Sequence, residues 1–224
     1  MRFGVVRFPG SCDERDTARA LSQFGEVRVL WHTERDLEGL DAVVLPGGFS
    51  YGDYLRPGAL ARFAPVMEAV CALAADGLLV LGICNGFQVL CEAGLLPGAL
   101  LLNASRRFQC AEVELEVENR ELPFTCACPE RITLLAKHRC GRYYLPEDRL
   151  QELQRQGRVV LRYALGERFN GSVVGVAGVA NERGNVFGLM PHPEHSVGVG
   201  GRSADGLFIF RSLVQALEGN GGDG

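Results

Sequence analysis

Residues 78–90 read LLVLGICNGFQVL, an apolar run that ends at a cysteine with a glycine two residues away on either side. The run from Leu78 to Ile83 is typical of a strand buried on both faces, and residues 86–93 are expected to form a helix. Glycine on both sides of Cys84 permits a sharp turn, because side chains there would clash with neighbouring backbone. The pattern predicts a nucleophile elbow with sulfur in place of a hydroxyl, at a helix N-terminus that favours the thiolate.

Strands and helices alternate on both sides of this stretch through the first half of the sequence. The expected strands are 3–8, 27–31, 42–45 and 78–83, and the expected helices are 11–24, 59–75 and 86–93. Ser11 and Glu14 are expected to form a capping box at the start of the first helix. This alternation predicts an α/β fold with a mostly parallel central sheet flanked by helices.

The second half has a different pattern, which begins with Val113, Leu115 and Val117 alternating with glutamates. Such alternation predicts a strand with one buried and one solvated face. Further strands are expected at 132–136, 159–163, 173–180 and 186–190, with a closing helix at 205–217. These strands predict a mixed or antiparallel extension of the sheet. No linker or repeat divides the chain, so we expect one domain over 1–219 and a disordered tail over 220–224.

Composition excludes several functions. The 224 residues carry a net charge of −4, which gives no bulk attraction to nucleic acid or to an anionic membrane. Lys137 is the only lysine and no phosphate-binding G-x-x-x-x-G-K-[ST] loop occurs, so the chain is not expected to hydrolyse ATP alone. The N-terminal apolar run is too short for a signal peptide, which predicts a cytoplasmic protein whose eight cysteines are free thiols.

Pro191-His192-Pro193-Glu194-His195 offers a base for a cysteine nucleophile. The prolines exclude a helix, and in extended chain residues i and i+2 point the same way. His192 and Glu194 are therefore expected to converge, with His195 on the opposite side and excluded as the base. We expect no metal site, because a His192–His195 pair lacks other ligands at suitable spacing.

Two further segments have functional interpretations. Pro46-Gly47-Gly48-Phe49-Ser50 ends a strand, where the Gly48 N–H and the Asn85 N–H are expected to form an oxyanion hole. A simple tight turn is the alternative. Cys126, Cys128, His138 and Cys140 could be zinc ligands, but one residue within each pair is too few for a usual structural zinc site. Small apolar packing is the favoured interpretation for these cysteines, as it is for Cys91.

Pro-Gly-Gly, Gly-x-Cys-x-Gly-x-Gln and Pro-His-Pro-Glu in this order resemble the class I (triad) glutamine amidotransferases. FPGSCD (8–13), WHTE (31–34), GGFSYGDYLRPGALARF (47–63), GLMPHPEH (188–195) and SADG (203–206) further resemble one subfamily, the glutaminase subunits of phosphoribosylformylglycinamidine synthases. The resemblance covers nearly the full length. It implies a flavodoxin-like amidotransferase domain that hydrolyses glutamine and passes ammonia on.

The resemblance also implies roles for individual residues. Cys84 corresponds to the nucleophile, His192 to its base and Glu194 to the orienting carboxylate, while Gln88, Phe49 and His138 correspond to substrate-binding positions. Where relatives often read HGEG, this chain has His138-Arg139-Cys140-Gly141.

The implied partners are a synthetase subunit, which holds ATP and magnesium, and a small third subunit; no cofactor is expected in this chain. Two alternatives remain open: another cysteine hydrolase on the same elbow, and a catalytically silent regulatory subunit.

Overall fold

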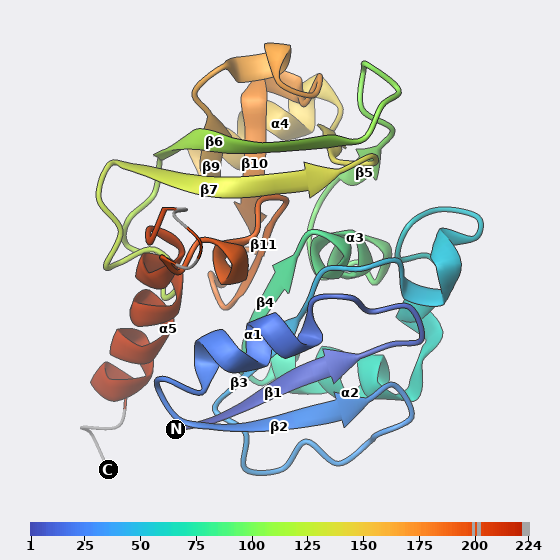
Figure 1. Cartoon of the computed structure of the whole chain (residues 1–224), viewed down its shortest axis with the longest axis vertical. Coiled ribbons are helices and arrows are strands. Elements are labelled where there is room, and N and C mark those ends of the chain that lie inside the picture. Colours follow the sequence, from blue (N-terminus) through green and yellow to red (C-terminus); the bar gives the residue numbers. More distant parts are fainter. Residues whose placement is uncertain (199, 201–202, 221–224) are drawn as a thin grey trace.

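A nine-stranded sheet runs through the molecule and changes from parallel to antiparallel near its middle (Figure 1). The computed structural model describes residues 1–198, 200 and 203–220, and the strand order within them is β2-β1-β3-β4-β11-β10-β9-β6-β7. The parallel strands are β2 (Glu26–Trp31), β1 (Arg2–Arg7), β3 (Ala42–Leu45), β4 (Leu79–Ile83) and β11 (Val186–Leu189). The antiparallel strands are β10 (Val176–Ala180), β9 (Val159–Tyr163), β6 (Gln109–Val117) and β7 (Arg131–His138). The expected parallel sheet with an antiparallel extension is confirmed.

Helices cover the parallel part on both faces, which explains its uninterrupted apolar strands. In Figure 1, α1 (Glu14–Leu21) and α5 (Gly206–Asn220) lie on the near side, with α2 (Pro65–Ala75) and α3 (Asn85–Glu92) on the far side. Every residue of β3, β4 and β11 is buried, as doubly covered strands require. Among the described residues, no helix has the length and apolar character needed to cross a membrane.

The structure corrects several expected boundaries. Asp13, and not Ser11, is the N-cap of α1. The Ser11 hydroxyl instead accepts a hydrogen bond from the Phe8 N–H at 3.0 Å, and Glu14 pairs with Arg7 at 3.3 Å. The expected capping box is wrong because Ser11 lies outside the helix, where it forms a β-bridge with Gly48.

Pro65 accounts for a second correction, since it starts α2 as its first residue and separates it from a short 3-10 helix at Ala61–Phe63. The expected strand 173–180 divides into a 3-10 turn, Val173–Gly175, and β10. Among the described residues, one α-helix and two strands were not expected: α4 (Glu147–Arg155) and the two-stranded sheet of β5 (Ala99–Leu101) with β8 (Arg142–Tyr144).

At the C-terminus, α5 continues to Asn220, three residues beyond the expected helix end. The expected tail therefore does not begin at residue 220, and residues 221–224 lie outside the described part of the chain. One domain over residues 1–219 stays a prediction.

Candidate active site

Cys84 occupies a strained turn between β4 and α3. Its backbone lies at φ 49°, ψ −101°, it is the N-cap of α3, and its N–H donates to the Leu189 carbonyl at 2.8 Å. The flanking glycines are required sterically: a Cβ on Gly86 would lie 2.0 Å from the Leu45 carbonyl oxygen, and one on Gly82 would lie 2.8 Å from the Gly86 backbone. A strained residue that packing holds so firmly is typical of a functional site. The structure thus has the strand–turn–helix that the glycines predict.

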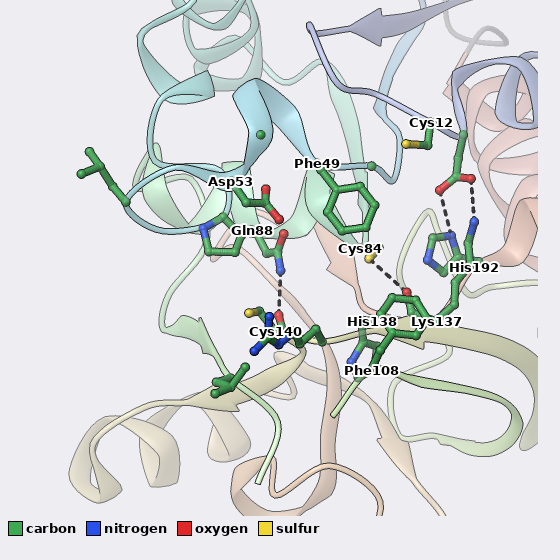
Figure 2. A pocket seen from close by; sticks show the side chains of 17 residues that line it. Cys12, Phe49, Asp53, Cys84, Gln88, Phe108, Lys137, His138, Cys140 and His192 are labelled. Atoms are coloured by element: carbon green, nitrogen blue, oxygen red, sulfur yellow. Dashed lines mark hydrogen bonds and ion pairs between the residues drawn. The ribbon is translucent and has the colours of Figure 1, made fainter. Parts of the chain in front are cut away.

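His192 comes from the end of the neighbouring parallel strand, where Leu189 of β11 pairs with Ile83 of β4. Its N–H donates to the Leu135 carbonyl on β7 at 2.7 Å, and its Nδ1 lies 2.6 Å from Glu194 Oε1. Both side chains are buried. Figure 2 shows Cys84 and His192 on the same side of the cavity, and His192 Nε2 has no hydrogen-bond partner among the described residues. The histidine and glutamate converge as the sequence predicts.

The charges around His192 favour its protonated form. Burial alone lowers the pKa of His192, but the Glu194 carboxylate and the Cys84 sulfur outweigh it and raise the pKa to about 10. A cationic imidazole beside a thiol stabilises the thiolate, which is the nucleophilic form of cysteine.

His195 does not point away from this site, so that expectation is wrong. Residues Pro193–His195 form a 3-10 turn and not an extended segment, and the turn brings His195 Nε2 to 3.1 Å from Asp13 Oδ1. The centroids of the His192 and His195 rings lie 5.4 Å apart. The proline fixes φ alone, which suits a 3-10 turn and an extended chain equally well.

Further possible ligands do lie near the two histidines, which corrects the expectation that they lack any. Ligand atoms of Asp13, His192, Glu194 and His195 lie within 4.8 Å of one another. These atoms already bind each other, and the Lys137 ammonium lies 2.6 Å from Asp13 Oδ1, where it would repel a cation. We therefore interpret the group as an ion-pair network. In the described part of the chain, the cysteines of the zinc alternative join no such group.

A cavity of about 540 Å³ opens beside Cys84 and His192. Its walls also include Gly48, Phe49, Gln88 and His138, four of the residues expected to bind substrate or oxyanion. Asn85 lies behind the wall as the first residue of α3. Gly48 has φ 151°, and a Cβ on it would lie 2.7 Å from the Cys12 nitrogen, so this wall position requires glycine.

The side chain of Asn85 has a role that the sequence does not reveal. Its Oδ1 accepts from the Ser50 N–H at 3.0 Å, and its Nδ2 donates to Gln88 Oε1 at 2.8 Å. Gln88 Nε2 donates in turn to the Cys140 carbonyl at 2.6 Å, as Figure 2 shows. This chain of amides joins the loop after β3, helix α3 and the loop after β7, so it fixes the shape of the wall remote from His192.

Asp53 lines the same wall of the cavity (Figure 2). Its Oδ1 lies 3.4 Å from Asn85 Nδ2. Burial raises the pKa of its carboxyl to about 6. Its backbone has φ 55°, and Tyr51 and Leu55 nearby also have positive φ. Such conformations are costly for residues with a side chain, so this loop is strained where it borders the cavity.

His138 is buried against the cavity in its neutral form. Burial lowers its pKa to about 3, and the charge of His192 adds to the effect. Its Nδ1 lies 3.1 Å from Asn103 Oδ1. Because an amide oxygen only accepts, Nδ1 carries the proton and Nε2 is left as an acceptor, which has no partner among the described residues.

Asp13, Lys137 and Asp53 also line the cavity, although no sequence pattern predicted it. Asp13 and Asp53 stand inside the segments FPGSCD and GGFSYGDYLRPGALARF, and Lys137 is the sole lysine. Those two segments and the single lysine were the only sequence features that could have pointed to these residues. None of them says that these side chains reach the cavity.

Comparisons with known proteins agree with this geometry. The CobB/CobQ-like glutamine amidotransferase domain matches residues 1–200. Phosphoribosylformylglycinamidine synthase subunit PurQ from Mycobacterium tuberculosis H37Rv is 54% identical over 220 residues, covering 96% of this chain and 97% of that protein. Its counterpart from Rubrobacter xylanophilus is 54% identical over 217 residues, covering 96% and 98%.

Solved structures give the same result. A chain in the structure of PurLQS from Thermotoga maritima superposes with a TM-score of 0.88 at 44% identity, covering 96% of this chain and 98% of that one. A glutamine amidotransferase from Thermotoga maritima superposes with a TM-score of 0.56 at 18% identity over 98% and 83% of the two chains, a likeness of fold alone. The chain therefore belongs to the CobB/CobQ-like glutamine amidotransferase family.

Proposed function

We propose that the chain is the glutaminase subunit of a phosphoribosylformylglycinamidine synthase, and that Cys84, His192 and Glu194 are its catalytic triad. One observation carries the proposal: the thiol and the imidazole stand at the carboxyl ends of paired parallel strands and face one cavity. This is the edge at which open α/β sheets bind their ligands.

In the first step the Cys84 thiolate attacks the side-chain carboxamide carbon of glutamine. A carbon–sulfur bond forms, the negative charge moves to the carboxamide oxygen, and the backbone N–H groups of Gly48 and Asn85 stabilise it. The carbon–nitrogen bond then breaks as His192 donates its proton to the leaving nitrogen, which departs as ammonia. A glutamyl thioester remains on Cys84.

In the second step His192, now neutral, takes a proton from a water molecule that attacks the thioester. The carbon–sulfur bond breaks, glutamate leaves, and the thiolate and imidazolium are restored. Glu194 stabilises the imidazolium in both steps through its 2.6 Å contact with Nδ1.

The remaining walls of the cavity hold the substrate. Gln88 and Phe49 border the space beside Cys84, and His138 Nε2 offers a buried acceptor to a substrate N–H group. Binding of free glutamine to this cavity needs no cofactor from this chain.

Ammonia in bulk water is protonated and lost as a nucleophile, so a glutaminase of this kind requires an acceptor nearby. The proposed partners are a synthetase subunit, which binds ATP and magnesium, and a small third subunit. They match the PurLQS assembly to which the superposed Thermotoga chain belongs. The product is formylglycinamidine ribonucleotide, made from formylglycinamide ribonucleotide in purine biosynthesis.

The test compares Cys84→Ser with the unaltered chain in the assembled complex. We expect glutamate release to fall to background while amidine formation from added ammonium continues. Cys91→Ser is the matched control: it lies on α3, burial raises the pKa of its thiol, and its sulfur donates to the Pro97 carbonyl away from the cavity. Retained glutaminase activity in Cys84→Ser would contradict the proposed triad. Glutamate release without amidine formation in the unaltered complex would contradict the proposed pathway.

A further inference from the structure

Asp13 lies at the centre of a buried network of charges beside His192. Its Oδ1 accepts from Lys137 Nζ at 2.6 Å and lies 3.1 Å from His195 Nε2, while its Oδ2 lies 3.6 Å from His192 Nδ1. Only 4% of the residue is exposed. Two carboxylates, those of Asp13 and Glu194, therefore face the same ring nitrogen.

The network keeps Asp13 ionised. Burial raises the pKa of an isolated carboxyl, but here the hydrogen bond from His195 and the charges of His192 and Lys137 hold the pKa well below its usual range. A buried carboxylate is costly unless it is paired in this way. The negative charge beside His192 is thus a permanent part of the site.

The position of Asp13 is fixed by three parts of the fold. Its backbone N–H donates to the Gly47 carbonyl at 3.2 Å, next to the proposed oxyanion amide. Its side chain reaches Lys137 on β7, whose own carbonyl lies 3.9 Å from Cys84 Sγ as its acceptor. A Cβ on Gly47 would lie 2.4 Å from Asp13 Oδ2 and 2.6 Å from His192 Cε1, so the two side chains pack in a space that glycine leaves open.

We propose that Asp13 is a second carboxylate partner of the His192 imidazolium, a positioning residue that acts through His192 and that Lys137 holds in place. Glu194 Oε1 accepts a short hydrogen bond from His192 Nδ1 at 2.6 Å. Asp13 supplies a further negative charge 3.6 Å from the same nitrogen, and the Lys137 ammonium beside Asp13 limits its effect. The expected effect on kcat rests on the proposed function. The expected effect on the pKa of His192 does not.

The titratable groups around His192 include the Glu194 carboxylate and the Cys84 sulfur, which raise its pKa. The whole set comes from the segment before α1, the start of α3, β7 and the turn after β11: Asp13, Cys84, Lys137, His138, Glu194 and His195. Among these, Asp13 and Lys137 form an opposed pair whose members can be neutralised separately. Neutralising one or the other should therefore shift the pKa of His192 in opposite directions, which a purely structural ion pair would not do.

The experiment measures the pKa of His192 by NMR in a chain labelled at its four histidines, with the His192→Asn variant assigning the resonance. Asp13→Asn is expected to lower this pKa by about one unit, because an opposite charge near the ring is lost. Lys137→Gln is expected to raise it, because the charge of Asp13 is then uncompensated. In the assembled complex, Asp13→Asn is expected to lower kcat for glutamine about tenfold with KM unchanged.

Asp16→Asn is the matched control. It removes the same charge three residues further along the chain, in the first turn of α1, and its carboxylate lies 3.9 Å from His195 Nε2 without contacting His192. The pKa of His192 is expected to stay at its original value in this variant.

If Asp13→Asn does not fold, as circular dichroism would show, the double variant Asp13→Asn/Lys137→Gln decides. It removes both buried charges together and leaves neither unpaired, and the pKa of His192 is expected to lie below that of the unaltered chain. An unchanged pKa in the single variants, or in the double variant, overturns the proposal. So does a change in KM alone. Because NMR does not depend on turnover, a failure of the proposed glutaminase activity would be recognised separately.

Discussion

The two ends of the cavity are built in different ways. The end that holds the proposed triad, called the reactive end (Cys84, His192 and Glu194), stands on two paired strands, where the Cys84 and His192 amides donate to carbonyls of Leu189 and Leu135. The binding end (Asp53, Asn85, Gln88 and Cys140) joins two loops to α3 through side-chain amides. At the reactive end, strand register sets the geometry. At the binding end, a few hydrogen bonds do so.

The two ends also differ in what lies around them. Glu194 and His192 are 3% and 1% exposed, whereas Phe49 and Leu55 at the mouth are 50% and 86% exposed. Strain is present at both ends, at Cys84 in the first and at Tyr51, Asp53 and Leu55 in the second. At a strand end, the hydrogen bonds and packing of the sheet hold a strained residue in place. A loop has fewer such contacts, so strain there destabilises the fold with less to offset it. The reactive end should therefore tolerate change poorly, and the binding end should tolerate it in graded steps.

The largest expected effect is at Gly47, which touches the reactive end. Gly47→Ala would place a Cβ 2.4 Å from Asp13 Oδ2 and 2.6 Å from His192 Cε1, so the imidazole must move. We expect kcat to fall about 100-fold or more, since displacement of a catalytic group by about 1 Å costs that much. Glutamate release in the assembled complex measures it. Gly219→Ala on α5 is the control, because no atom of the described residues lies within 4 Å of the added Cβ. Full activity in Gly47→Ala would contradict the claim that the reactive end is rigid.

A smaller effect is expected at Gln88 in the binding end. Gln88→Met keeps the length of the side chain but removes the bonds to Asn85 and the Cys140 carbonyl. The loss of these two hydrogen bonds should raise KM for glutamine about tenfold and change kcat little. Steady-state kinetics separate the two parameters, with Gln151→Met on the exposed face of α4 as the control. A fall in kcat with KM unchanged would assign Gln88 to the reactive end instead.

The same contrast explains what the sequence could predict. Cys84 and its glycines form a local pattern, and His192 and Glu194 are two residues apart, so both were accessible from spacing alone. Asp13 was not, because its partners Lys137 and His195 lie 124 and 182 residues away. The pairing of β11 with β4 and the β-bridge between His192 and Leu135 of β7 bring such groups together.

Local ambiguity accounts for the other misses. The segment 193–195 was expected to be extended, and the prolines could not distinguish that from the 3-10 turn that places His195 beside Asp13. Three-residue strands such as β5 and β8 pair only with each other, so neither carries an alternating pattern long enough to read.

The smallest expected effect concerns Asp53, and it tests whether the buried carboxylate at the binding end destabilises the fold. Burial raises the pKa of Asp53 from 3.8 to about 6 in the folded chain. The charged carboxylate therefore destabilises the fold above pH 6. Below pH 3.8 the carboxyl is protonated in both the folded and the unfolded state, so it changes the free energy of unfolding little. Asp53→Asn should therefore raise the free energy of unfolding at pH 7 by about 1 kcal/mol, after allowance for solvent screening of this partly exposed group. The gain should shrink as the pH falls through 6, which makes urea unfolding at low pH an internal control. A loss of stability at pH 7 would mean that the hydrogen bond to Asn85 stabilises the fold by more than the burial of the charge destabilises it. Asp53 would then stabilise the strained loop.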